Sequence, residues 1–225
     1  MSKKSAEERR RRAAEMRAQR QRQERRRNIA IGVGVVLVGA LVLGAAGFGV
    51  YNVWNRRNIE GLESFDVGRG HVAASVDYEQ NPPAGGEHNP AWQNCDVYTE
   101  PIVNEFGVHA LEHGAVWITY QPDLDAEQVQ KLEARYTPGS YVLISPYEDN
   151  LPAPIVASAW GKQIKLDNAE DERLDKFLRT YEQHPGVPEP GAACSGMVGF
   201  TAKQFEEQGG FENLDLSGGM DDPTS

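Results

Sequence analysis

The stretch Ala115-Val-Trp-Ile-Thr-Tyr120 decides the fold, because its β-branched and aromatic residues predict a strand. Directly before it stands His109-Ala-Leu-Glu-His113-Gly114. The residues between the two histidines are good helix formers, and Gly114 is a natural stop at the C-terminal end of a helix. We therefore expect one helical turn that ends at Gly114 and leads directly into the strand.

Further segments downstream show the same two periodicities. A helix is expected from Asp125, which can cap its first turn, through Tyr136, with Gln128 completing a capping box. A second helix is expected at about residues 170–183, where apolar residues recur at helical spacing. Strands are expected at residues 141–145, 155–160 and, upstream, 71–76.

This order of elements predicts the α+β class. We expect a small antiparallel or mixed sheet with two helices on one face, similar to a split βαβ unit. One transmembrane helix precedes this domain in the prediction.

The transmembrane prediction rests on residues 29–50, an uninterrupted apolar, glycine-rich run. At about 1.5 Å per residue, the run spans roughly 33 Å, which is enough to cross a hydrocarbon core of about 30 Å. The apolar part of a cleaved signal peptide has only about 7–15 residues. We therefore expect a retained single-pass anchor at residues 29–53, with Tyr51 and Trp54 near its outer interface.

The charge distribution predicts the orientation of this anchor. Residues 1–28 carry twelve Lys/Arg against four Glu, whereas residues 58–225 carry nine Lys/Arg against 29 Asp/Glu. The basic arm should stay cytoplasmic, near anionic lipid headgroups, with the C-terminal domain outside the cell membrane. The arm has no aromatic residue for base stacking and the domain is acidic, so we expect no nucleic-acid partner. An envelope protein partner stays unknown.

The length of the outer part bounds its organisation. Residues 58–205 are enough for one core and too few for two typical domains. Residues 206–225 form an acidic, glycine-containing tail without periodicity, which we expect to be disordered. The only two cysteines, Cys95 and Cys194, share an oxidising compartment in this topology, so a disulfide is favoured over a thiolate metal site.

Four of the five histidines lie between residues 71 and 113. On a helical turn, His109 and His113 come within roughly 5–6 Å and can approach one ion. His71 and His88 stand in neighbouring loops and can add two further imidazoles. Imidazole suits zinc or copper, so these four histidines form a candidate metal site, to which Met197 could add a soft contact for Cu(I).

Two other interpretations stay open. The histidines can instead hydrogen-bond buried loops and stabilise a structural or partner-binding domain. The string His109-Ala-Leu-Glu112-His113 also matches the H-x-x-E-H motif of zinc peptidases, in which the glutamate activates water. That motif needs a long helix and a further carboxylate, whereas Gly114 ends this helix early. His184 is interpreted as a residue at a helix end rather than as a ligand.

Three strings together resemble a known family: Pro82-Pro83-Ala-Gly-Gly-Glu-His88, Val108-His109-Ala-Leu-Glu-His113-Gly114-Ala-Val-Trp-Ile-Thr-Tyr120, and Ala159-Trp160-Gly161. They are similar to actinobacterial members of the "domain of unknown function 3105" family, over about residues 58–200. The resemblance implies an envelope-exposed domain, often membrane-anchored, with no established activity. This chain departs from the family pattern at Glu87, where a proline or small residue is usual.

The leading hypothesis is therefore a membrane-anchored extracytoplasmic domain that binds zinc or copper through a histidine cluster. The alternatives are a structural or partner-binding envelope domain and a zinc-dependent hydrolase. The sequence favours no catalytic residue and leans against an enzyme.

Overall fold

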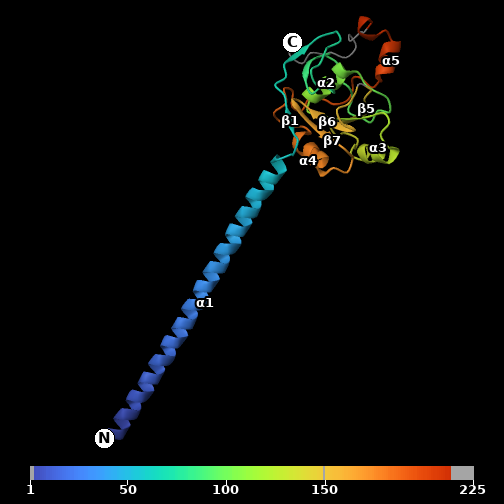
Figure 1. Cartoon of the computed structure of the whole chain (residues 1–225). Helices are drawn as coiled ribbons and strands as arrows, with labels where there is room; N and C mark the ends of the chain where they lie inside the picture. The colour runs from blue at the N-terminus through green and yellow to red at the C-terminus, as the bar shows by residue number, and fades with distance from the viewer. Residues whose placement is uncertain (1–2, 149, 214–225) are drawn as a thin grey trace. The chain divides into compact units, whose positions relative to one another are not determined.

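The computed structural model describes residues 3–148 and 150–213 (Figure 1). The side chains of some residues in the first helix lie outside this description. The chain divides into two units, Met1–Asn55 and Arg56–Ser225.

The first unit is almost entirely the helix α1, Lys3–Arg57. Within it, Gln19–Val50 is long and apolar enough to cross a membrane. The described apolar side chains of this part are well exposed, among them Leu41, Leu43 and Val50. A helix that is apolar on all sides and has exposed side chains is suited to lipid as its solvent. Tyr51 and Trp54 have side chains outside the described set, so their predicted interfacial positions stay predictions.

The second unit is built on a five-stranded mixed sheet with the order β1-β7-β6-β4-β5. Its strands are β1 Glu63–Ser64, β4 Val116–Tyr120, β5 Val142–Pro146, β6 Ile155–Ala159 and β7 Lys162–Leu166. Strands β4 and β5 are parallel, and the pairs β4–β6, β6–β7 and β1–β7 are antiparallel. A separate two-stranded parallel sheet joins β2 Arg69–His71 to β3 Gly86–His88.

Helices cover the two faces of the five-stranded sheet. Helices α3 (Ala126–Glu133) and α4 (Glu172–Tyr181) pack against one face, where Leu132 and Phe177 join the core around Ile118. Helix α2 (Asn104–Glu112) packs against the other face, where Leu111 lies in a cluster with Trp117. The alternation of side chains along β4 explains this division, since neighbouring residues of a strand point to opposite faces.

The α+β class, the mixed sheet and the two helices on one face are confirmed. Asp125 caps α3 as predicted, accepting a hydrogen bond from the Glu127 amide. The predicted capping box is wrong, because the Gln128 side chain accepts a hydrogen bond from the Ala169 amide instead.

Other details of the prediction are also corrected. The strand expected at residues 71–76 ends at His71. Strand β7 was not predicted, and it follows β6 through the two-residue turn Trp160-Gly161, where Gly161 has φ +66°. The unit is not a split βαβ, because β5 lies directly beside β4 and β6 lies on the other side of β4.

The C-terminal segment is structured further than expected. The tail predicted from residue 206 begins inside α5 (Ala202–Glu207), and the 3-10 turn η1 (Gly210–Glu212) follows. Phe211 packs against Phe106 and Phe205, which supplies the apolar contact that holds this segment. The remainder of the predicted tail, residues 214–225, lies outside the described residues.

Candidate metal centre

Helix α2 carries three of the polar side chains that form the site. Glu112 and His113 follow His109 by three and four residues, so the side chains of both lie next to the His109 side chain on the helix surface. The helix has nine residues, more than the single turn expected, and His113 is its C-cap. Gly114 ends it with φ +100°, a left-handed conformation that glycine adopts without steric cost. Helix and strand pack tightly, since a Cβ added at Gly107 would lie 2.9 Å from the Trp117 ring.

The small sheet brings the other two histidines to this helix. His71 on β2 stands opposite His88 on β3 in the register of the pair. Val72 donates its amide to the His88 carbonyl oxygen at 2.8 Å, and the Val76 amide donates to Glu105 Oε1 at 2.7 Å. These bonds tie the segment that follows His71 both to β3 and to the first turn of α2.

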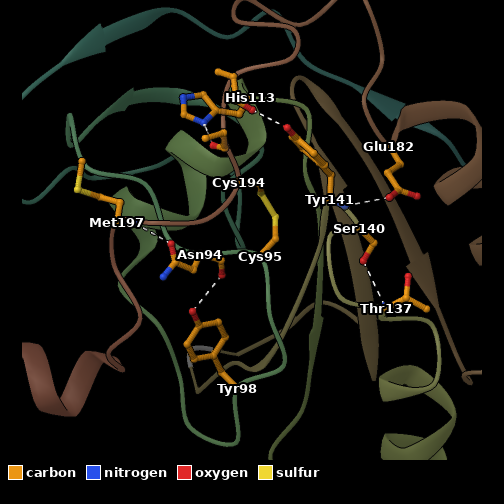
Figure 2. Close-up of a disulfide and its surroundings, with 12 residues drawn as sticks. Asn94, Cys95, Tyr98, His113, Thr137, Ser140, Tyr141, Glu182, Cys194 and Met197 are labelled. Carbon is orange, nitrogen blue, oxygen red and sulfur yellow. Dashed lines mark hydrogen bonds between the residues drawn. A yellow bond between two sulfur atoms is a disulfide. The ribbon is translucent and has the colours of Figure 1, made fainter. Parts of the chain in front are cut away.

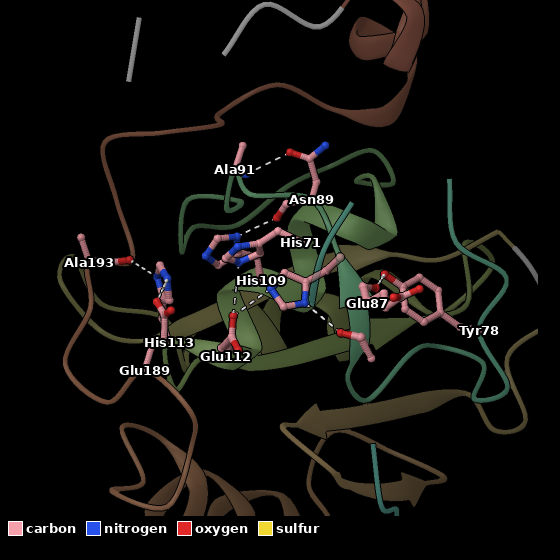
Figure 3. Close-up of polar contacts among 12 residues, drawn as sticks. His71, Tyr78, Glu87, Asn89, Ala91, His109, Glu112, His113, Glu189 and Ala193 are labelled. Carbon is pink, nitrogen blue, oxygen red and sulfur yellow. Dashed lines mark hydrogen bonds and ion pairs between the residues drawn. The ribbon is translucent and has the colours of Figure 1, made fainter. Parts of the chain in front are cut away.

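The four predicted histidines form one group of neighbouring rings, of which Figure 3 labels His71, His109 and His113. The His71 ring lies 4.9 Å from His88 and 5.0 Å from His109, measured between ring centroids. His109 lies 4.8 Å from His88 and 4.5 Å from His113. Three of these side chains are buried, whereas the His71 side chain is 46% exposed. The rings of His71, His88 and His109 thus form a triangle with His113 beside His109, and the group reaches the surface at His71.

Backbone carbonyl oxygens bind the Nδ1 atoms of three histidines. His88 Nδ1 lies 2.8 Å from Gly86 O, His109 Nδ1 lies 2.7 Å from Asn89 O, and His113 Nδ1 lies 2.6 Å from Ala193 O. A carbonyl oxygen only accepts, so each Nδ1 must carry the proton. In the neutral ring, Nε2 is then left with a free lone pair, which is the usual state of a metal-ligating histidine.

Glu112 provides a carboxylate to the same group. Its Oε2 lies 2.8 Å from His88 Nε2 and 3.7 Å from His71 Nε2, and its side chain is only 5% exposed. One ligand atom from each of His71, His88, His109 and Glu112 lies within 4.8 Å of every other. These four residues could hold a metal ion, and we call this candidate site the metal centre.

The electrostatics of the centre keep its groups in the state that a cation requires. Burial, together with the charge of the neighbouring His113, lowers the pKa of His109 to about 3, although its hydrogen bond to the Asn89 carbonyl works in the opposite direction. Burial alone would raise the pKa of Glu112, but the hydrogen bond and charge of His88 outweigh this and lower it. Near neutral pH the centre therefore presents a neutral imidazole and an ionised carboxylate.

His113 lies beside this centre and has different partners. Its Nε2 lies 3.3 Å from Glu189 Oε2, and Trp92 packs against its ring at 5.0 Å between centroids. Its ligand atom groups with those of His109 and Glu189, again within 4.8 Å. Burial lowers the pKa of His113, although its hydrogen bond to the Ala193 carbonyl works in the opposite direction.

The segment that carries Glu189 is fixed by backbone bonds and by a disulfide. The Glu189 amide donates to the Glu112 carbonyl oxygen, and the Gln183 amide donates to the Gly114 carbonyl oxygen. Figure 2 shows the disulfide between Cys95 and Cys194. The Cα atoms of the two cysteines lie 5.3 Å apart, and the bond confirms the predicted pairing. Because Cys194 follows Ala193, the bond also holds the carbonyl that binds His113.

The structure brings together the four histidines that the sequence predicts as candidate ligands, and it adds two carboxylates that the sequence does not predict as ligands. The sequence motif predicts Glu112 only as a catalytic base, although its position one turn after His109 also allows it to be a ligand. No sequence pattern pointed to Glu189, which is 76 positions beyond His113. Met197, considered as a soft ligand, packs against the apolar cluster around Phe106. The exposed His184 follows α4, and its Nδ1 accepts a hydrogen bond from the Gly186 amide.

The fold and the site define an α+β domain with a buried histidine–carboxylate cluster, in a chain with an N-terminal helix apolar enough for a membrane. The chain belongs to the family described as "Protein of unknown function (DUF3105)", whose family model matches residues 71–196. The matched region begins at His71 and includes every residue of the metal centre, as well as His113, Glu189 and both cysteines. No curated protein and no solved structure matches the chain.

Proposed function

We propose that this protein is a single-pass, membrane-anchored domain, located outside the cytoplasm, that binds one transition-metal ion through His71, His88, His109 and Glu112. The observation that carries the proposal is the orientation of the imidazoles. The Nδ1 atoms of His88 and His109 are held by backbone carbonyls, and both residues offer Nε2 to the same group of ligand atoms. A carbonyl bound to the second nitrogen is the outer partner that metal-ligating histidines characteristically have.

The contact between His88 and Glu112 supports a bound cation. With its Nδ1 proton committed to Gly86, neutral His88 faces the carboxylate with a lone pair at 2.8 Å. Two acceptors repel each other at this distance unless a positive charge joins them. That charge is either a second proton on His88 or a metal ion that both atoms bind.

The spacing of the group fits one ion after a small rearrangement, in which the 2.8 Å contact between His88 and Glu112 opens and the wider pairs close. Two ligand atoms at 2.0–2.1 Å from a tetrahedral ion lie about 3.3 Å apart. The widest pair of the centre lies within 4.8 Å, so it needs to close by about 1.5 Å at most. His71 is the residue best able to supply this movement, because it is half exposed and lies at the end of a three-residue strand.

The ligand types favour zinc or copper. Imidazole nitrogen suits these ions, whereas magnesium and calcium prefer sites made entirely of oxygen. A three-histidine, one-carboxylate set offers no thiolate, so nothing in it selects Cu(I) over the divalent ions.

The proposed orientation rests on the basic arm. The twelve Lys/Arg of residues 1–28 keep the N-terminus cytoplasmic and place residues 58–225 outside. Protease added to intact cells should digest an epitope at the C-terminus and spare one at the N-terminus. Protection of the C-terminal epitope, with an outer-surface control digested, would reverse the assigned topology.

Two other functions have specific observations in their favour. The His88–Glu112 distance is also that of a hydrogen-bonded ion pair, as a purely structural or partner-binding domain would contain. The alternative of a zinc-dependent hydrolase requires a further carboxylate downstream of the motif. Glu189 provides one, since its ligand atom groups with those of His109 and His113. Glu112 would be its base, but this carboxylate already contacts His88. Metal binding without catalysis therefore has the better support.

Metal analysis of the full chain tests the proposal. The protein should be purified in detergent without a polyhistidine tag, stripped with chelator, incubated with Zn(II) or Cu(II) and dialysed before elemental analysis. We expect close to one tightly bound ion per chain. H88Q and E112Q should each weaken binding by tenfold or more, because each removes a ligand from the buried group.

H184Q is the matched control, because His184 is exposed and lies outside both ligand groups. It should leave the stoichiometry and affinity unchanged. If the wild-type chain retains no ion, or if H88Q and E112Q bind as tightly as H184Q, the metal function is wrong. The structural role then becomes the better account.

A further inference from the structure

The His113–Glu189 pair repeats the arrangement found at His88 and Glu112. In both pairs the histidine Nδ1 is bound to a backbone carbonyl, and its Nε2 faces a carboxylate oxygen. For neutral His113 the two facing atoms are both acceptors, at 3.3 Å. A positive charge between these two atoms would relieve the repulsion, and that charge is either a second proton on His113 or a cation that both atoms bind.

His109 stands between the two pairs and belongs to both groups. One of its ring nitrogens lies within 4.8 Å of ligand atoms of His71, His88 and Glu112, and one lies within 4.8 Å of ligand atoms of His113 and Glu189. Its Nδ1 is occupied by the Asn89 carbonyl, so Nε2 is its single free ligand atom. One lone pair binds one ion, so His109 can serve only one of the two groups at a time.

Trp92 supplies a third observation at the same place. Its ring lies 5.8 Å from the His109 ring and 5.0 Å from the His113 ring, measured between centroids. The indole Nε1 atom is buried and has no hydrogen-bond partner among the described residues. A buried donor of this kind normally has an acceptor, and a water molecule or hydroxide held by a cation is such an acceptor.

The two groups differ in their access to solvent. Glu189 is 46% exposed, whereas Glu112 is only 5% exposed. A cation beside Glu189 can keep water ligands, while one beside Glu112 is held mainly by protein atoms. The first arrangement suits a weaker and more readily exchanged ion.

We propose that His113 and Glu189 form a second cation position, for the same class of imidazole-binding divalent ion, that shares His109 with the metal centre. This inference rests on the proposed function in one respect, because His109 is common to both positions. The second position is the weaker one, and it gains His109 when the metal centre is incomplete.

The test removes the metal centre and keeps the second position. The full-length H71Q/H88Q variant lacks two ligands of the centre but retains His109, His113 and Glu189. Titrated with Co(II) alone and followed by visible absorption, it should keep a weaker site. Adding E189Q should lower the affinity of this residual site by at least about tenfold, since a ligand is lost.

E207Q is the control, because Glu207 is an exposed carboxylate on α5 outside both groups. Added to H71Q/H88Q, it should leave the residual affinity unchanged. Absence of Co(II) binding by H71Q/H88Q, or equal affinity with and without E189Q, would overturn the second position. A wild-type chain that binds no ion would instead overturn the metal centre, so the two failures are distinguishable.

If H71Q/H88Q does not fold, as judged by near-ultraviolet circular dichroism, the comparison is made in the otherwise wild-type chain. A second, weaker equivalent of Co(II) should then bind to the wild type and disappear in E189Q. The same number of equivalents in both proteins would overturn the inference.

Discussion

Replacing His109 with glutamine should remove a pH dependence from the stability of the metal-free domain. The His109 residue is 3% exposed, and burial, reinforced by the nearby His113, lowers its pKa to about 3 from an ordinary value of 6.5. In the unfolded chain the same ring titrates near 6.5. Between these two values the unfolded chain binds a proton that the native domain does not, so the free energy of unfolding rises with pH.

The expected magnitude follows from the size of the shift. A difference of about 3.5 pKa units corresponds to about 5 kcal/mol, at about 1.4 kcal/mol per unit. This contribution is fully present above pH 6.5 and is lost as the pH falls towards 3. Glu112 contributes to stability over a lower pH range. Because its pKa in the folded domain is lowered from 4.5, its contribution to the free energy of unfolding is present above pH 4.5 and is lost as the pH falls below that value.

Urea unfolding of the full chain in detergent, with chelator present, measures this effect. Tryptophan fluorescence should be followed between pH 4.5 and 7, because Trp117 is fully buried. The free energy of unfolding of H109Q should rise less steeply with pH than that of wild type, by about 1.4 kcal/mol per pH unit. H184Q, which changes an exposed histidine, should follow the wild-type slope. Parallel slopes for H109Q and wild type would refute the assignment of a neutral, buried His109.

Two stability predictions follow from the backbone around the site. Replacing Cys95 and Cys194 by alanine should lower the free energy of unfolding by about 4–5 kcal/mol in urea, because the bond closes a loop across 99 positions; a loss below 1 kcal/mol would contradict it. G114A should lower the melting temperature more than G139A. Both glycines have positive φ, so each substitution should lower the free energy of unfolding by about 1–2 kcal/mol. Of the two, only Gly114 has backbone next to the added Cβ, which would lie 3.1 Å from Gln183 Cα. Equal melting temperatures would show that this contact relaxes freely.

The sequence predicted those elements whose periodicity is long or strong. The strand at β4 and the helix at α4 were found because β-branched runs and apolar residues at helical spacing are local signals. Strand β7, Lys-Gln-Ile-Lys-Leu, was missed although its alternation of polar and apolar residues is visible. The signal that would have found it is the short turn Trp160-Gly161, since a two-residue loop ending in glycine is typical of a hairpin.

The candidate site was predictable to the extent that its residues are close in the sequence. His109 and Glu112 share a helical face, so their proximity follows from α2 alone. The partnership of His71 with His88 depends on the register of a three-residue sheet, which no local pattern specifies. Glu189 reaches His113 only because backbone bonds and the disulfide fold residues 182–194 over the end of α2. Such contacts arise from tertiary structure and leave no periodic trace.

The stability of the metal-free domain bears on what the cluster is for. The face of the sheet covered by α3 and α4 has an almost entirely apolar core, so the fold has a source of stability that does not involve the histidines. Burying several imidazoles and carboxylates on the other face costs more free energy than burying apolar side chains of similar size would. In addition, the lowered pKa of His109 makes the domain less stable in acid. A residue kept only for folding should not have this cost, whereas a ligand for a cation should. The combination expected of H109Q is therefore weaker metal binding together with a flatter stability profile between pH 4.5 and 7. A variant that lost stability across the whole range and bound metal normally would instead show that His109 serves the fold.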